Sequence, residues 1–224
     1  INDLQFTKDG QRLLYVQDDV LRSCDARTGA AHDFEIEVGE LIDGYELVTT
    51  PSGSKRIVAQ TARGPRIWKF DDGSPIDIPV GFGRSAIQRI SPDKRIICIA
   101  SPDRPFAALK LEDGQILREV DTPPARNIRF TPDSMIAIVI AREGRTLTPV
   151  ALSDSEFEVS PPLTFDFAIR NVRPLTNSRA VAAITAGPNQ DEDEAKPTVH
   201  VHDLITGDRL AQIRPSERVS QFRL

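Results

Sequence analysis

Apolar and polar residues alternate over short stretches of this chain, and clusters of turn-forming residues interrupt the alternation. Five stretches share one plan, a polar turn followed by an apolar strand: FTKDGQRLLYV (6–16), TTPSGSKRIVA (49–59), ISPDKRIICIA (90–100), FTPDSMIAIVI (130–140) and RPLTNSRAVAAI (173–184). Alternation bounded by turn residues predicts β-strands. Helical periodicity extends over no more than about one turn, so we predict an all-β protein.

A second pattern follows each of these stretches at a nearly constant offset. It reads LRSCDARTG (21–29), IWKFDDG (67–73), ALKLEDG (108–114), PVALSDS (149–155) and VHVHDLITGD (199–208). In each, a strand ends near an acidic residue, and a Gly or Ser then opens a turn into a further short strand. Gly29, Gly73 and Gly114 are 44 and 41 residues apart, which indicates a repeated structural unit.

A unit of about 40–50 residues with four short strands is the sequence signature of a β-propeller blade, because a four-stranded sheet buries its two faces by stacking between other sheets. We therefore predict a single all-β propeller region over residues 1–224, with five four-stranded blades and the first strand of a sixth. The expected units are 1–40, 41–83, 84–124, 125–165 and 166–217, and the sixth begins at 218–224. Five blades and one strand do not form a closed ring, so we expect an open fragment or part of a larger propeller.

The strands and turns resemble those of the WD-repeat family, whose blade runs from an SPDG-like turn to a strand that ends in Trp-Asp. The matching pairs are Cys24-Asp25, Phe70-Asp71, Leu111-Glu112, Leu152-Ser153 and His202-Asp203. The acidic residue is present in four of these five pairs and the tryptophan in none, and no Gly-His pair precedes a blade, so the family's His-Ser-Asp-Trp network is not expected. The resemblance implies a propeller of about seven blades. It also implies a non-catalytic scaffold or sensor within a larger regulatory protein.

Composition narrows the choice of partners. The chain has 28 Lys and Arg against 33 Asp and Glu, a net charge of −5, so a general nucleic-acid partner is not expected. The richest apolar run, MIAIVIA (135–141), has the length of a strand, so no membrane insertion is expected. Cys24 and Cys98 lie in apolar runs, which favours buried free thiols over a disulfide and a reducing compartment such as the cytoplasm.

Motifs for catalysis are absent from the sequence: it has no Gly-rich phosphate loop, GxSxG elbow or HExxH pair. His200 and His202 share one face of a strand, but no suitably spaced third metal ligand accompanies them, so packed strand residues are the simpler interpretation. Asp9, Asp93 and Asp133 recur with the repeat, which indicates turn residues that bond their own backbone amides. We predict no catalytic residue, no metal site and no cofactor.

Arginines are frequent in the loops expected on one face of the propeller. The loops between second and third strands and the connections between blades emerge on the same face, where a rigid scaffold positions them for binding. These segments contain Arg63, Arg84, Arg104, Arg126, Arg142 and Arg170, with Arg66 and Arg145 as neighbours. Guanidinium groups suit carboxylates and phosphates, so we predict that this face binds an acidic or phosphorylated peptide of a protein partner. Solvated loop arginines are the alternative.

The hydrophilic segment GPNQDEDEAKPT (187–198) lies between two strands of the fifth unit, so it is an insertion rather than a linker. Its consecutive carboxylates lack the alternate spacing and the Gly turn of a calcium loop. Disorder is one interpretation. In the other, Asp191 and Asp193 belong to the partner-binding surface, and the insertion either folds across the arginines or extends as a contact arm.

An alternative function is a propeller attached to an enzyme, for example a peptidase whose substrate access it gates. A metal at the propeller axis would need carboxylates or histidines near the starts of the innermost strands, and only Asp3 is acidic there. This disfavours an axial metal but leaves open a catalytic domain outside these residues.

Overall fold

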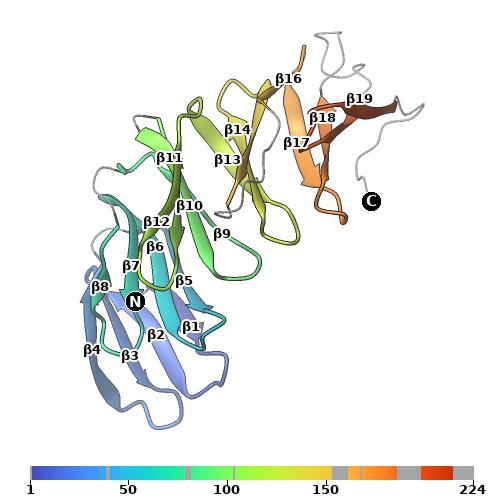
Figure 1. Cartoon of the computed structure of the whole chain (residues 1–224). Helices are drawn as coiled ribbons and strands as arrows, with labels where there is room; N and C mark the ends of the chain where they lie inside the picture. Colours follow the sequence, from blue (N-terminus) through green and yellow to red (C-terminus); the bar gives the residue numbers. More distant parts are fainter. Residues whose placement is uncertain are drawn as a thin grey trace, which may run out of the picture.

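The computed structural model describes residues 2–38, 41–78, 82–102, 104–152, 161–166, 168–185 and 198–213 (Figure 1). In these ranges the chain forms five antiparallel sheets of four strands each, and every strand pairs with its neighbours in chain order. The predicted all-β propeller architecture with four-stranded blades is confirmed. Nowhere in these ranges does a helix with the length and apolarity of a membrane span occur.

Each sheet falls within one of the five expected units. The first contains β1 (Asn2–Phe6), β2 (Arg12–Gln17), β3 (Val20–Asp25) and β4 (Ala31–Glu37). The second contains β5 (Leu41–Thr49), β6 (Lys55–Thr61), β7 (Gly64–Lys69) and β8 (Pro75–Ile76). The third contains β9 (Ile87–Ile90), β10 (Ile96–Ser101), β11 (Arg104–Lys110) and β12 (Ile116–Val120). The fourth contains β13 (Ala125–Phe130), β14 (Ile136–Ala141), β15 (Thr146–Ala151) and β16 (Leu163–Thr164), and the fifth contains β17 (Ile169–Pro174), β18 (Ala180–Thr185), β19 (Thr198–Asp203) and β20 (Arg209–Ile213).

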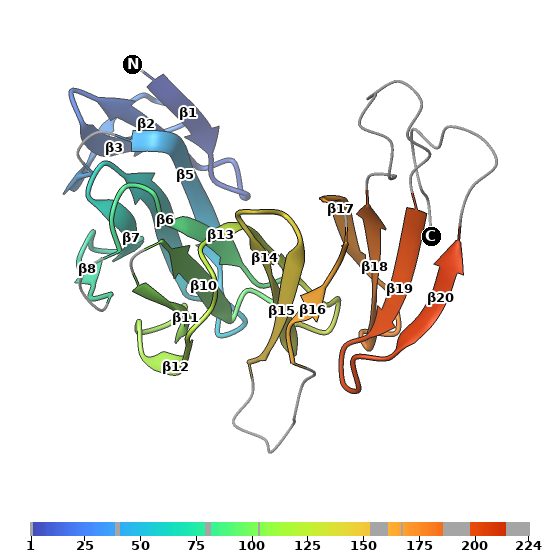
Figure 2. The same cartoon turned by 90° about the horizontal axis from the view of Figure 1, so that it is seen from above.

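The five sheets stand side by side in a curved row (Figures 1 and 2). Figure 2 shows β1, β5, β13 and β17, the first strands of their sheets, toward the inside of the curve. The first and fifth sheets lie at opposite ends of the row in both views, so the described residues form an open arc. The expected first strand of a sixth blade, 218–224, lies outside the described residues, and the total number of blades stays a prediction.

The hydrophobic core consists of layers between neighbouring sheets. Because strand residues alternate between faces, Ile97 and Ile99 of β10 pack toward the second sheet, whereas Cys98 of the same strand packs toward the fourth. The middle sheets are therefore apolar on both faces. All six residues of β14 are buried for this reason, which explains why its sequence is a continuous apolar run rather than an alternating one.

The two cysteines are free thiols in different surroundings. Cys98 is fully buried, as predicted, and this burial raises the pKa of its thiol well above the usual value. The prediction of burial is wrong for Cys24, which is half-buried. Cys24 pairs with Leu13, which pairs with the 62 % exposed Phe6, so all three lie on the face of the first sheet that points away from the second.

The turn between the first and second strands recurs with the same hydrogen bonds. Asp9 Oδ1 accepts from Thr7 Oγ1 at 2.6 Å and from the Gln11 N–H at 3.0 Å. Asp93 and Asp133 make the equivalent pair of bonds in the third and fourth sheets. The prediction that these three aspartates are turn residues is confirmed.

Two serines at the next turn position link neighbouring sheets. Ser134 and Ser178 have φ values of 63° and 57°, a backbone conformation that glycine adopts more easily. The Asp93 N–H donates to Ser134 Oγ at 3.1 Å, and the Asp133 N–H donates to Ser178 Oγ at 3.2 Å. A hydrogen bond of about 1 kcal/mol offsets a backbone strain of about the same size.

The turns that join third and fourth strands correct the alignment with Trp-Asp. The N–H groups of Gly73 and Gly114 donate to the carbonyl groups of Lys69 and Lys110, as the N–H groups of Gly29 and Gly207 do to Asp25 and Asp203. The residues equivalent to Cys24-Asp25 are therefore Trp68-Lys69 and Leu109-Lys110, not Phe70-Asp71 and Leu111-Glu112. In the fourth sheet the Leu152 N–H donates to the Met135 carbonyl group as the Ala26 N–H does to that of Gln11, so the equivalent pair is Val150-Ala151, not Leu152-Ser153. The repeat thus contains one tryptophan at this position. The acidic residues misled the alignment because they belong to the following turn, where Asp72 Oδ1 accepts the Ser74 N–H at 2.9 Å.

The Asp9 turn predicts an acid-sensitive contribution to stability. The hydrogen bond from the Thr7 hydroxyl, assisted by the Gln11 N–H, lowers the pKa of Asp9 from 3.8 to about 2. This carboxylate therefore favours the folded state at neutral pH, and the contribution is lost as the pH falls through about 2. Asp9→Asn should lose less stability than the wild type between about pH 4 and pH 2, because its amide does not titrate.

Urea unfolding at each pH measures this difference. Asparagine supports the same turn, since Asn177 Oδ1 accepts the Arg179 N–H in the fifth sheet, so the variant should fold. Parallel pH profiles for the two proteins would contradict the prediction.

Candidate functional site

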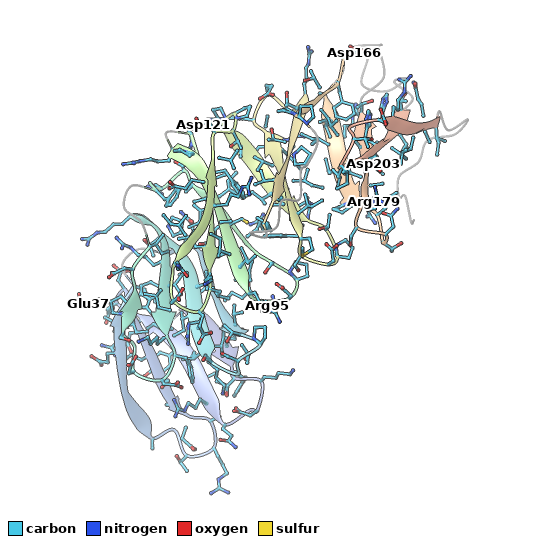
Figure 3. The ribbon with its side chains drawn as sticks, in the orientation of Figure 1. Glu37, Arg95, Asp121, Asp166, Arg179 and Asp203 are labelled. Atoms are coloured by element: carbon cyan, nitrogen blue, oxygen red, sulfur yellow. The ribbon has the colours of Figure 1, made fainter. Side chains whose placement is uncertain are left out.

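The six predicted arginines lie along one edge of the row of sheets. Arg63 and Arg142 lie in loops between second and third strands, and Arg84 lies in the connection from β8 to β9. Arg104, Arg126 and Arg170 are the first or second residues of β11, β13 and β17, which begin at this edge. All six are exposed, and we call them the arginine face. Figure 3 shows Asp121 and Asp166, from two connections between sheets, at this edge and Arg95 and Arg179 at the opposite one.

Four of these arginines, Arg63, Arg104, Arg142 and Arg170, form no ion pair with any residue that the structure describes. They come one from each of the second to fifth sheets. The edge also carries carboxylates: Asp18, Asp19, Asp121, Glu143 and Asp166. Counting the described residues alone, this edge is acidic at the first sheet and richer in cations over the other four.

Arg126 has a structural role in addition to its exposure. Its Nη2 donates to the carbonyl oxygen of Ile169 at the start of β17, so the side chain joins the fourth and fifth sheets. The same guanidinium lies beside Gly144, where an added Cβ would be 3.0 Å from Arg126 Nη1. Fewer of its donors can therefore reach a partner. Nothing in the sequence distinguishes Arg126 from the other five arginines.

A polar pocket of about 350 Å³ opens beside Arg126, and the sequence analysis did not predict it. Residues of the first strands β5, β9 and β13 line most of it, together with β6. Gln60 and Gln88 contribute buried Oε1 atoms that have no hydrogen-bond partner among the residues that the structure describes, while Gln60 Nε2 donates to the Arg84 carbonyl at 3.2 Å. The pocket thus offers acceptors for N–H or O–H groups next to a guanidinium. Gln60, a polar residue in the buried strand β6, is its signal in the sequence.

The pair of histidines packs between the fourth and fifth sheets. His200 and His202 share one face of β19, and their rings lie 5.6 and 5.3 Å from the ring of Phe165, edge to face. His200 Nε2 lies 3.2 Å from Thr185 Oγ1, and His202 Nδ1 lies 3.2 Å from the Gly207 carbonyl oxygen. In the described ranges no three His, Cys, Asp or Glu side chains gather as metal ligands would. These are the contacts of packed strand residues.

Asp191 and Asp193, the remaining predicted partner-binding residues, lie outside the described residues, as does nearly all of the 187–198 insertion. Their place relative to the arginine face stays a prediction.

Several solved structures resemble this fold. The computationally designed Ika8 protein matches with a TM-score of 0.58 and 18 % identity, over 98 % of this chain and 64 % of that chain. Hsv2p of Kluyveromyces lactis, a propeller, matches with a TM-score of 0.57 and 12 % identity, over 89 % of this chain and 60 % of its own. A eukaryotic initiation factor matches with a TM-score of 0.56 and 14 % identity, over 92 % of this chain and 52 % of that chain.

The chain therefore spans between 52 % and 64 % of the length of these three structures. At such identities the likeness concerns the fold, and it agrees with the five four-stranded sheets in defining a β-propeller. No protein-family model and no curated protein matches the sequence.

Proposed function

We propose that this chain is a non-catalytic protein-interaction module, a WD-repeat-like propeller region of a larger regulatory protein in the cytoplasm. It binds an acidic or phosphorylated peptide through the arginine face. The observation that carries this proposal is the set of four exposed guanidinium groups, Arg63, Arg104, Arg142 and Arg170, with no carboxylate partner in the described part of the chain. Their donors suit a partner that brings its own negative charge.

The repeat of the arginines suggests how a peptide would lie. Arg63, Arg104 and Arg142 come from hairpins at the same edge of three successive sheets. Sheets that pack face to face are about 10 Å apart, and an extended peptide rises about 3.3 Å per residue. A peptide that crosses the edge would therefore present a carboxylate or phosphate to successive arginines at about every third residue.

The turns support the WD-repeat-like type. Trp68 is buried between the first and second sheets at the position where the family has its tryptophan. Asp25 and Asp203 accept N–H groups of their own turns, from Arg27 and Thr28 in the first sheet and from Ile205 and Thr206 in the fifth. These bonds explain the acidic residue at the ends of β3 and β19, whereas Lys69 and Lys110 hold this position in the second and third sheets.

Charge reversal tests the proposal. The double variant Arg104→Glu/Arg142→Glu should lose at least about tenfold in affinity for a fluorescent peptide with phosphoserine at every third position, because two attractions become repulsions. Fluorescence polarisation at low and high salt measures the affinity, which should also fall with salt for the wild type. Both side chains are exposed, so the melting temperature should not change.

The matched control is Arg27→Glu/Arg209→Glu, which makes the same change of charge at exposed turn and strand positions outside the arginine face. It should bind as the wild type does. Equal losses in the two double variants would reduce the effect to net charge and contradict a site on the arginine face, as would the absence of binding to the wild type.

A further inference from the structure

A groove of different chemistry lies at the edge opposite to the arginine face. It has a volume of about 390 Å³ and runs from the turn between β5 and β6 to the ends of the third sheet. Pro51, Ile96 and Leu117 line it with apolar side chains, and most of its accessible wall is apolar. Lys94, Arg95 and Lys110 line it as well, so cations surround an apolar floor.

The three cations are held only weakly by the protein itself. Lys94 Nζ lies 3.3 Å from Glu46 Oε1, and Arg95 Nε lies 3.9 Å from Asp93 Oδ2. Both are surface pairs, and such pairs contribute little because water and salt screen them. Lys110 Nζ donates to the neutral Gln115 Oε1 at 2.6 Å, so its charge has no counter-charge there.

The carboxylate in the groove, Glu112, does not cancel this charge. Its Oε1 accepts from Arg56 Nη2 at 2.9 Å and from Ser54 Oγ at 2.8 Å, so it is already paired with the second sheet. Lys94, Arg95 and Lys110 therefore leave an excess of positive charge at the rim, in a protein whose net charge is −5.

An equivalent groove between the fourth and fifth sheets differs in its chemistry, although its volume is also about 390 Å³. Arg179 occupies the same position in its repeat unit as Arg95. The Leu204 N–H donates to the carbonyl group of Arg179, as the Leu111 N–H donates to that of Arg95. Ile205 and Met135 line this second groove, and Arg179 is the single cation among the described residues that line it. The cationic rim is thus a property of the first groove and not of the repeat.

We propose that the groove beside Arg95 binds a peptide segment of a protein partner in which one apolar side chain is followed by carboxylates. The apolar side chain occupies the floor formed by Pro51, Ile96 and Leu117, and the carboxylates contact Arg95 and Lys110. Charge complementarity favours this occupant over an uncharged apolar segment, and the apolar floor favours it over a free anion. The site is separate from the arginine face, so the propeller can hold two segments at opposite edges.

Binding of defined peptides tests this site. The probe is a fluorescent Gly-Ser peptide with one leucine followed by three aspartates, with two matched peptides in which glycine replaces the leucine or asparagines replace the aspartates. The first should bind saturably, and each matched peptide should bind at least about tenfold more weakly. Backbone amide shifts in NMR spectra should change at Arg95, Ile96 and Leu117.

Variants locate the binding site. Arg95→Glu/Lys110→Glu should lose at least about tenfold in affinity for the leucine–aspartate peptide. Both side chains are exposed, so the variant should keep the wild-type melting temperature. Arg179→Glu, at the same repeat position of the other groove, should bind the peptide as the wild type does. Arg104→Glu/Arg142→Glu, on the arginine face, should lose less affinity for it than Arg95→Glu/Lys110→Glu does.

Three results would overturn the proposal. The first is that the wild type shows no saturable binding of the leucine–aspartate peptide. The second is that Arg179→Glu loses as much affinity for this peptide as Arg95→Glu/Lys110→Glu does. The third is that only Arg104→Glu/Arg142→Glu loses affinity, which would place the peptide on the arginine face. Failure here leaves the test of the arginine face unaffected, because that test uses other residues and another peptide.

Discussion

Replacing Arg56 with alanine should destabilise the protein by about 3 kcal/mol. Arg56 is 5 % exposed and joins the second sheet to the third. Its Nη2 donates to the carbonyl oxygen and to Oε1 of Glu112, both at 2.9 Å, and its Nη1 donates to the Lys55 carbonyl oxygen at 3.0 Å. Alanine would leave the carbonyl oxygens of Lys55 and Glu112 without this buried donor, whereas the Glu112 carboxylate, 43 % exposed, can turn to water. The cost of unpaired buried groups exceeds the value of an ordinary hydrogen bond.

Urea unfolding of Arg56→Ala beside Arg22→Ala measures this effect. Arg22 Nε lies 2.9 Å from Glu35 Oε1, the same distance as in the Arg56 pair, but the Arg22 pair is exposed and lies within one sheet. Its loss should cost much less than the loss of the Arg56 pair, because water and salt screen an exposed pair. Similar midpoints for the two variants would show that the bridge between sheets contributes no special stability.

The second large effect is expected at Gly114, which lies in the turn between β11 and β12. Its φ of +77° is strained for alanine. An added Cβ would lie 2.9 Å from Ile76 Cγ2, in the last strand of the second sheet, and would overlap the carbonyl oxygen of Asp77, the residue after that strand. Gly29 has the same place in the first sheet and a φ of +72°, but its Cβ would meet nothing within 4 Å. Gly29→Ala should therefore cost about 1 kcal/mol for the backbone alone.

Gly114→Ala should cost at least about 2 kcal/mol more than Gly29→Ala, because the second and third sheets must move apart to admit the methyl group. Thermal or urea unfolding of the two variants gives this difference directly. Equal stabilities would mean that the contact between these sheets yields without cost.

Most of the fold could be predicted because its signals are local. Turn residues such as Asp9 and Asp133 recur beside apolar strands, and alternation of side chains identifies the strands themselves. The predicted alignment of the third strands with the Trp-Asp pair was wrong by two residues. Asp71 and Glu112 are acidic like the aspartate of that pair, but they lie in the next turn. A shift by two residues keeps the same face of a strand, so the error did not disturb the fold.

The candidate site was only partly predictable. Chain topology alone brings Arg63, Arg104 and Arg142 to one edge, since hairpins of successive blades emerge together. The hydrogen bond by which Arg126 joins the fourth and fifth sheets could not be predicted, nor could the cationic groove. Both depend on which side chains meet between neighbouring sheets. The partner of the arginine face and the place of Asp191 and Asp193 stay predictions.

The sequence by itself determined the all-β class, the repeated unit and the edge at which each loop emerges, because these follow from alternation, turn chemistry and strand direction. Only the tertiary structure decided that Arg56 meets Glu112, 56 residues away, and that Lys110 joins Arg95 at the rim of one groove. Contacts between sheets depend on packing distances and side-chain rotamers, and no periodic sequence pattern encodes these.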